Sequence, residues 1–127
     1  MSRFSVKKKG IATITIKCKE PAVNGYKTQT FSADIKKLYG DEKDQFMQTI
    51  GTRKAVDVCR QLVTKIDKIG WFIEEDGQPV VTLKDADLAE FFDDMDAEMV
   101  DYVIQPLSAE CIKVQDESTR QMLEAKN

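Results

Sequence analysis

Histidine is absent from the 127 residues of this sequence. Its absence removes the commonest general base at neutral pH and a favoured metal ligand. The sequence also has no glycine-rich phosphate loop and no nucleophile elbow, two motifs typical of phosphate-binding and hydrolytic enzymes. We therefore expect a protein that is not an enzyme and that holds no metal and no cofactor.

Cysteine is scarce, and long apolar runs are missing. Cys18, Cys59 and Cys111 lie far apart, with neither the paired spacing of a metal site nor the density of a disulfide framework, which suits a reducing cytoplasm. No apolar stretch reaches the length of about 18 residues that a membrane span needs, and residues 1–10 lack the apolar run of a secretory signal. We expect a soluble intracellular protein without a membrane partner.

What the sequence does have is a strong separation of charge. Residues 1–70 carry 15 Lys and Arg residues against 7 Asp and Glu residues, a net charge of +8, whereas residues 71–127 carry 4 against 15, a net charge of −11. The two halves together give the formal net charge of −3. With 42% hydrophobic residues, the chain can bury one modest core, so a single domain over residues 1–127 is expected.

A β-hairpin is predicted near the N-terminus. Residues 11–18 alternate between apolar and polar side chains and contain a run of β-branched residues, a pattern typical of a strand. Asn24-Gly25 tolerates the positive φ angles of a tight turn, and residues 26–31 favour a second strand. Because an isolated hairpin is not stable in water, we expect it to pack on the rest of the chain.

Three helices are predicted between residues 32 and 70. The first spans residues 33–39 and the second spans residues 41–50. The third spans residues 55–69, where apolar residues recur at spacings of three and four before Gly70. We expect this third helix to form the centre of the core.

The acidic half begins with a turn and continues as helix. The Asp-Gly pair at 76 and 77 predicts a tight turn within residues 71–82. The apolar residues that follow recur at helical spacing, which predicts a helix over residues 84–105, either continuous or broken near Asp96, that ends at Pro106. Its apolar stripe consists of Leu88, Phe91, Phe92, Met95, Met99, Val103 and Leu107.

Together these patterns predict an α+β fold, with an N-terminal β-hairpin packed on a mainly α-helical domain. Its parts are a basic β-hairpin region (1–31), helices (32–70), a turn (71–82) and acidic helices whose end is frayed (83–127).

The acidic residues of the second half allow three interpretations. Carboxylates at positions 93, 94, 96, 98 and 101 could bind calcium or magnesium, but the spacing and central glycine of an EF-hand loop are missing. On a helix these side chains also fan around the axis, so a solvated acidic face is favoured. The same acids could instead imitate a phosphate backbone in a small acidic regulator that binds a host protein, an alternative that the sequence leaves open.

Basic and aromatic residues are interleaved in residues 1–31, as in binders of single-stranded nucleic acid. The pI of about 5.1 and the lack of a recognisable binding motif favour an ordinary charged surface or a protein partner, so no nucleic acid is expected. The stripe from Leu88 to Leu107 is expected to lie mostly in the core, with some of it left for partners.

One short pattern resembles a known family. Gly70-Trp71 is followed by the segment Glu75-Asp76-Gly77-Gln78-Pro79-Val80 and then by an acidic helix with an aromatic pair. This order resembles the tail assembly chaperones of long-tailed bacteriophages, in which the tryptophan, the D-G-x-P turn and the following helix recur. The resemblance marks Trp71, Asp76, Gly77 and Pro79 as its structural motif.

The resemblance implies a non-enzymatic function in the cytoplasm of a bacterial host. Chaperones of this family bind the tape measure protein and keep it soluble until the tail tube protein polymerises around it, and they are not expected in the mature virion. A longer form made by ribosomal frameshifting typically recruits the tail tube protein, and this chain would be the short form.

The charge separation leads to a hypothesis of self-association. Copies with a basic and an acidic half can bind head to tail, which gives a ring or a helical array suited to coating a long partner. The expected apolar contact uses Leu88, Phe91, Phe92, Met95 and Met99, and the expected electrostatic contact joins Asp87, Glu90 and Asp94 of one copy to Lys7, Lys8, Lys9 and Lys17 of the next. The same charged surfaces could instead meet within one monomer.

Overall fold

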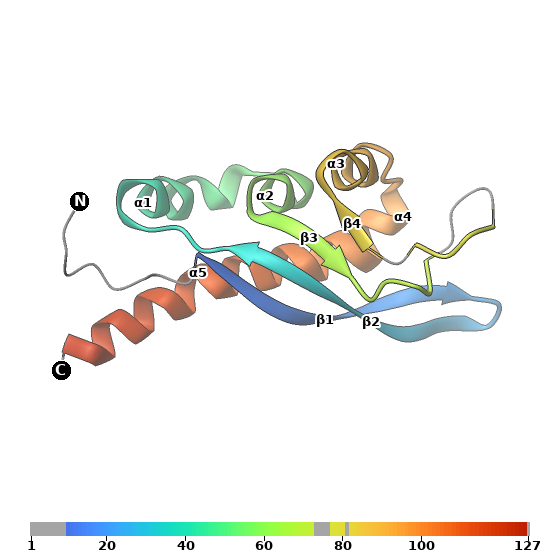
Figure 1. Cartoon of the computed structure of the whole chain (residues 1–127), viewed down its shortest axis with the longest axis horizontal. Coiled ribbons are helices and arrows are strands. Elements are labelled where there is room, and N and C mark those ends of the chain that lie inside the picture. The colour runs from blue at the N-terminus through green and yellow to red at the C-terminus, as the bar shows by residue number, and fades with distance from the viewer. Residues whose placement is uncertain (1–9, 73–76, 81, 127) are drawn as a thin grey trace.

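The computed structural model describes residues 10–72, 77–80 and 82–126, and for residues 21–22 and 117–126 it describes the backbone (Figure 1). Lys7, Lys8, Lys9 and Asp76, which the sequence singled out, lie outside the described residues. Among the described helices, none is long and apolar enough to cross a membrane.

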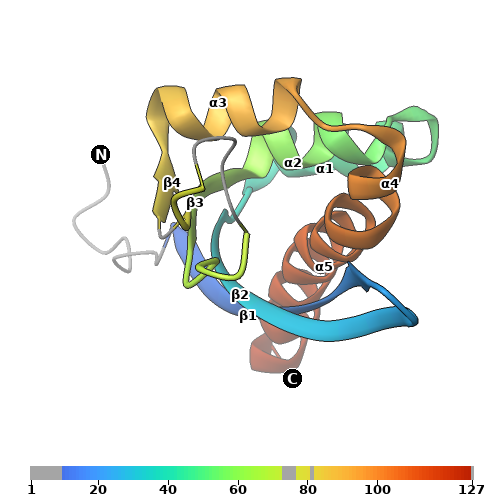
Figure 2. The same cartoon turned by 90° about the vertical axis from the view of Figure 1, so that its right-hand side faces the viewer.

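The fold is α+β, as predicted, with helices packed on one face of a four-stranded antiparallel sheet. The sheet order is β1-β2-β3-β4, and its strands are β1 (Ile11–Ala22), β2 (Gly25–Lys36), β3 (Val63–Asp67) and β4 (Thr82–Lys84). The helical elements are α1 (Gly40–Thr49), the 3₁₀ turn η1 (Ile50–Thr52), α2 (Ala55–Leu62), α3 (Asp85–Asp93), α4 (Ala97–Met99), the π turn η2 (Val100–Ile104) and α5 (Gln105–Lys126). Figure 2 shows the sheet curving around α5, with α2 and α3 above it.

β1 and β2 form the hairpin that the sequence predicted. Ile16 lies opposite Phe31, and both side chains are buried on the face that the helices cover, whereas the alternate residues of β1 lie on the open face. The turn lies one residue earlier than predicted, with Val23 and Asn24 at its centre. Gly25 begins β2 with φ +119°, a conformation that glycine adopts without a steric penalty.

The predicted helix over residues 33–39 is wrong, because β2 continues to Lys36. Ala33 and Ile35 are buried and the residues between them are not, which is the alternation of a half-buried strand. β1 lies opposite β2 along this whole stretch, with Ile11 opposite Lys36. Each residue from Ala33 to Lys36 therefore has a residue of β1 paired with it.

The predicted helix over residues 55–69 is correct only for its first part. α2 ends at Leu62, and the chain continues directly as β3 between β2 and β4. Val63 and Ile66 are both buried, and their spacing of three fits a helix as well as this strand, whose pairing with β2 shifts register at one point. The β-branched residues of this segment favour a strand once neighbouring strands are present. The segment expected to be one central helix is therefore a helix followed by a strand, and both contribute fully buried residues to the core.

The acidic half forms two helical segments that are separated by a break near Asp96, which is one of the two predicted alternatives. Asp96 starts the second segment, because its Oδ1 accepts a hydrogen bond from the N–H of Met99 (2.8 Å). The prediction that this helix ends at Pro106 is wrong, since it runs on through η2 into α5. In η2 the N–H of Gln105 donates to the carbonyl of Val100, five residues back. Such a wide turn accommodates a proline, which lacks an N–H and crowds the carbonyl four residues before it in a regular α-helix.

One apolar core joins the sheet to the helices. The sheet contributes Ile16, Phe31, Ala33, Ile35 and Ile66, and the helices contribute Phe46, Val58, Leu62, Phe92, Ile104 and Leu107. Gln115 of α5 is 0% exposed at the edge of this core. Its Oε1 accepts a hydrogen bond from the N–H of Leu38 (2.8 Å), and its Nε2 donates to the carbonyl of Lys36 (2.8 Å). α5 is therefore tied to the chain that leaves β2.

Candidate functional site

The apolar stripe of the acidic half lies largely in the core. Leu88, Phe91 and Phe92 are 6%, 8% and 3% exposed, and Met95 and Met99 are half-buried against the core. The predicted apolar contact with a neighbouring copy is therefore wrong for Leu88, Phe91 and Phe92, because α3 packs these side chains against the sheet and α2. The expectation that the stripe belongs mostly to the core is confirmed.

The carboxylates predicted for self-association lie on the outer face of α3. Asp87, Glu90 and Asp94 are exposed, and no ion pair among the described residues includes them. Their neighbour Asp93 is bound by the guanidinium of Arg60 on α2. Within the described ranges, no cluster of acidic or thiol side chains has the arrangement of a metal site. The outer face of α3 is a solvated acidic surface.

Lys17 lies on the opposite side of the molecule from α3. Its side chain is exposed on the face of the sheet that the helices leave uncovered, as are Thr13 and Thr15 of the same strand. Lys19 is also exposed, but its side chain lies near the ring of Tyr26, beside the helical segment that contains Tyr102. Figures 1 and 2 both place α3 above the core and the β1–β2 hairpin below it. Within one chain, the acidic face of α3 therefore does not meet Lys17, although Asp101 of the acidic half lines the same groove as Lys17 and Lys19.

Trp71 of the predicted structural motif holds the end of the sheet together. Its indole Nε1 donates a hydrogen bond to the carbonyl of Thr30 (2.9 Å). Thr30 belongs to β2 and lies two residues before Ser32, where the pairing of β2 with β3 begins. The ring of Phe72 lies 6.1 Å from that of Trp71 and 5.5 Å from that of Phe91, so the aromatic contacts continue into α3. Gly77 is exposed and has a φ of +85°. These contacts give Trp71 a structural role.

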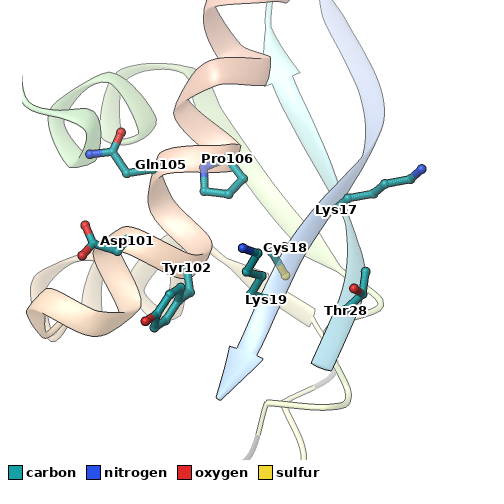
Figure 3. Close-up of a pocket in the computed structure, with 8 residues that line it drawn as sticks. All are labelled: Lys17, Cys18, Lys19, Thr28, Asp101, Tyr102, Gln105 and Pro106. Carbon is teal, nitrogen blue, oxygen red and sulfur yellow. The ribbon is translucent and has the colours of Figure 1, made fainter. Parts of the chain in front are cut away.

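A groove lies between β1 and the start of the long C-terminal helix (Figure 3). We call it the hairpin groove; it has a cavity volume of about 460 Å³ and is lined by Lys17, Cys18, Lys19, Thr28, Asp101, Tyr102, Gln105 and Pro106. Figure 3 shows Tyr102 and Pro106 on the side of the helix that faces β1, whereas Lys17 points away from the helix. The hydroxyls of Tyr26 and Tyr102 share a hydrogen bond, with ring centroids 4.7 Å apart, and so join the hairpin to the helix beside this groove.

The thiol and the phenol that line the hairpin groove stay protonated at neutral pH. Burial, with a smaller contribution from the carboxylate of Glu20, raises the pKa of Cys18 to about 11. The hydrogen bond with Tyr26, with burial as a second cause, raises the pKa of Tyr102 to about 12. Both groups are therefore suited to packing and hydrogen bonding rather than to nucleophilic attack.

The sequence did not indicate the hairpin groove. Tyr26 and Tyr102 are 76 positions apart, and neither belongs to a motif that would have paired them. The available signal was the set of aromatic residues interleaved with lysines near the hairpin, which included Tyr26 but said nothing of its partner.

Comparison with known proteins gives no relative. No protein-family model, no curated protein and no solved structure matches this chain.

Proposed function

We propose that this chain is a phage tail assembly chaperone that associates head to tail with further copies of itself and binds the tape measure protein, keeping it soluble until the tail tube polymerises. The proposal places the protein in the cytoplasm of a bacterial host, without enzymatic activity. The observation that carries it is that α3, with its exposed Asp87 and Glu90, and β1, with its exposed Lys17, lie on opposite sides of one domain.

The two surfaces fit head-to-tail association. Asp87, Glu90 and Asp94 on α3 are exposed, and so are Lys17 and Lys19 on β1. A contact between different surfaces repeats from copy to copy, which generates a ring or an open helical array rather than a closed dimer. Many weak contacts along one long client then increase the overall affinity through effective concentration.

The sequence pattern behind the family resemblance also supports the proposal. Trp71, Gly77 and Pro79 belong to the segment that connects β3 to β4, the strand that leads into the acidic helix α3, and Trp71 is hydrogen-bonded to the carbonyl of Thr30 in β2. The motif thus joins the basic part of the chain to its acidic part, the two parts that the proposed contact requires.

Charge reversal tests the self-association. Sedimentation velocity of the wild-type chain at low salt is expected to show oligomers that dissociate as salt rises, because exposed ion pairs are screened. Lys17→Glu combined with Lys19→Glu should give monomers, and so should Asp87→Lys combined with Glu90→Lys. An equimolar mixture of the two double variants should assemble again, since each acidic hairpin then meets a basic α3.

A matched control changes the same charge elsewhere. Lys54, which immediately precedes α2, and Lys113 of α5 are both exposed and belong to neither proposed contact surface. Lys54→Glu combined with Lys113→Glu should therefore leave the oligomers intact. A wild-type chain that stays monomeric at low salt and high concentration would contradict the proposal, as would a mixture of the complementary variants that fails to assemble.

Client binding is tested by co-expression. The tape measure protein encoded in the same genome should move from the insoluble to the soluble fraction when the wild-type chain is present, and it should co-purify with several copies of it. A one-to-one complex with a nucleic-acid enzyme, without oligomers, would instead favour the small acidic regulator.

A further inference from the structure

A second groove lies away from the hairpin, where the chain between α1 and α2 approaches the C-terminal helix. We call it the helix groove; it has a cavity volume of about 510 Å³ and is lined by Ile50, Arg53, Lys54, Ala55, Val56, Val58, Val100, Gln105, Ser108 and Ile112. η1 and the first turn of α2 form one wall, and η2 with the start of α5 forms the other.

The helix groove is apolar along its length and basic at its rim. Ile50, Val56, Val100 and Ile112 are half-buried, so each has one side packed on the core and another side open to the groove. None of the residues that line the groove is acidic. Lys54 is exposed at the rim, beside Arg53.

The guanidinium of Arg53 is held in place at this rim. It donates hydrogen bonds to Gln61 Oε1 and to the carbonyl of Asp57 (3.1 Å), and it lies 5.6 Å from the ring centroid of Phe46. A guanidinium fixed in this way loses little side-chain entropy when a carboxylate approaches. The rim therefore favours a partner with acidic residues beside its apolar contact.

We propose that the helix groove binds an amphipathic helix of a partner protein, whose apolar ridge lies on Ile50, Val56, Val100 and Ile112 and whose acidic flank faces Arg53 and Lys54. A row of half-exposed apolar residues between two helical walls is the surface that an amphipathic helix covers through residues spaced by three and four. The inference deepens the proposed function, because it names the site at which a helical client would bind.

Among the side chains that the structure describes, no helix of a second copy offers an apolar ridge suited to the helix groove. The ridge must be apolar and exposed before binding, but Phe46 of α1, Leu62 of α2 and Phe92 of α3 are buried in their own core. In the C-terminal helix, Leu107, Cys111 and Val114 are buried as well, and Ile112 itself lines the groove. We therefore assign the occupant to a helix from another protein, separate from the charged contact between copies.

Methyl NMR of the full chain tests the site with two synthetic probes. One probe is a 21-residue amphipathic peptide with a leucine ridge flanked by glutamates, and the other has the same ridge flanked by lysines. The glutamate peptide should shift the methyl signals of Ile50, Val56, Val100 and Ile112, while those of Ile14 and Val23 on the hairpin stay in place. Its affinity should exceed that of the lysine peptide by about fivefold or more, as expected for two exposed charge pairs.

Substitution at the rim gives a variant that keeps the fold. Lys54 is exposed and precedes α2, where an acidic residue is favourable to the helix dipole, so Lys54→Glu should be as stable as the wild type. It should weaken the glutamate peptide and strengthen the lysine peptide, each by about threefold to fivefold, whereas Lys113→Glu should change neither. Methyl shifts confined to other surfaces, or equal affinity for the two peptides, would overturn the inference.

Co-expression separates the site from the function. A tape measure protein that the wild type solubilises but that Lys54→Glu and Val56→Glu solubilise equally well contradicts the helix groove and leaves the chaperone function standing. A glutamate peptide that binds in the groove, together with a tape measure protein that stays insoluble, supports the groove and contradicts the chaperone function.

Discussion

Replacing Gln115 by leucine should remove the two hydrogen bonds that hold α5 to the end of β2 and so lower the stability of the fold. In the wild type, the side-chain amide of Gln115 satisfies two backbone groups at once, the N–H of Leu38 and the carbonyl of Lys36, each at 2.8 Å. Both the glutamine and Leu38 are buried, so water does not readily replace the lost partner at the Leu38 N–H. The leucine side chain is close to glutamine in size, and the change therefore isolates the loss of hydrogen bonds from the creation of a cavity.

The expected loss follows from the cost of buried, unpaired polar groups. Leaving one such backbone group without a partner costs about 1–3 kcal/mol. The carbonyl of Lys36 is near the surface, where water can reach it, so the lower end of that range applies to it and the upper part to the N–H of Leu38. We expect the free energy of unfolding to fall by about 2–4 kcal/mol, a large share of the roughly 5–15 kcal/mol of a typical domain.

Urea denaturation followed by circular dichroism measures this loss, and amide hydrogen exchange locates it. The urea concentration at the unfolding midpoint should fall, while the dependence of the unfolding free energy on urea (the m-value) should not change. The Leu38 amide should exchange much faster than in the wild type. Gln48→Leu is the matched control, because Gln48 is exposed on α1 and its replacement should change stability by less than about 0.5 kcal/mol. A Gln115→Leu variant as stable as the wild type, with Leu38 still protected, would refute the reasoning.

Three further predictions concern single side chains. Trp71→Phe keeps the aromatic contact with Phe72 but removes the hydrogen bond to the Thr30 carbonyl, so the free energy of unfolding measured with urea should fall by about 1 kcal/mol; an unchanged midpoint would contradict the structural role of Trp71. Hydrogen bonds from Thr82 and from the N–H of Lys68 hold the pKa of Asp67 below its usual value, so the stability that this carboxylate adds is fully present above its unfolded pKa of about 3.9 and is lost as the pH falls through the lowered native pKa. NMR titration should show a higher Asp67 pKa in Thr82→Val, and an unchanged pKa would rule out this cause. A hydrogen bond with Cys111, together with burial, raises the pKa of Cys59, and all three cysteines are buried, so iodoacetamide at pH 8 should label them by mass spectrometry only after unfolding; rapid labelling of the native chain would show that these thiols are accessible.

The hairpin could be predicted from sequence because its signal is local. Alternation along residues 11–18 and a glycine suited to the turn specify two paired strands without reference to the rest of the chain. The break near Asp96 is also local, since that residue caps the helix that follows it. The apolar stripe on α3 was correctly expected to lie mostly in the core, because its spacing leaves one continuous face to bury.

β3 could not be predicted in the same way. Leu62, Val63 and Ile66 have a spacing that fits a helix and a bulged strand equally, and the choice depends on whether β2 and β4 are there to pair with. The two grooves depend even more on tertiary structure. Tyr26 reaches Tyr102, and Val56 lies near Ile112, only after the sheet and helices have packed. Single-sequence patterns carry no information about such distant neighbours.

The π turn keeps a row of apolar residues on the core-facing side of the C-terminal helix. Met99, Val103, Leu107 and Cys111 recur every four residues, and in an α-helix of 3.6 residues per turn each step of four overshoots a full rotation by about 40°. Without correction, the row would wind around the helix and leave the core. The wide turn from Val100 to Ile104 accommodates more residues in one rotation and cancels part of that drift, so that Val103, Leu107 and Cys111 are all buried. Replacing Pro106 by alanine would therefore not by itself convert the π turn into regular α-helix. The apolar residues before and after the turn face the core only while the turn is present.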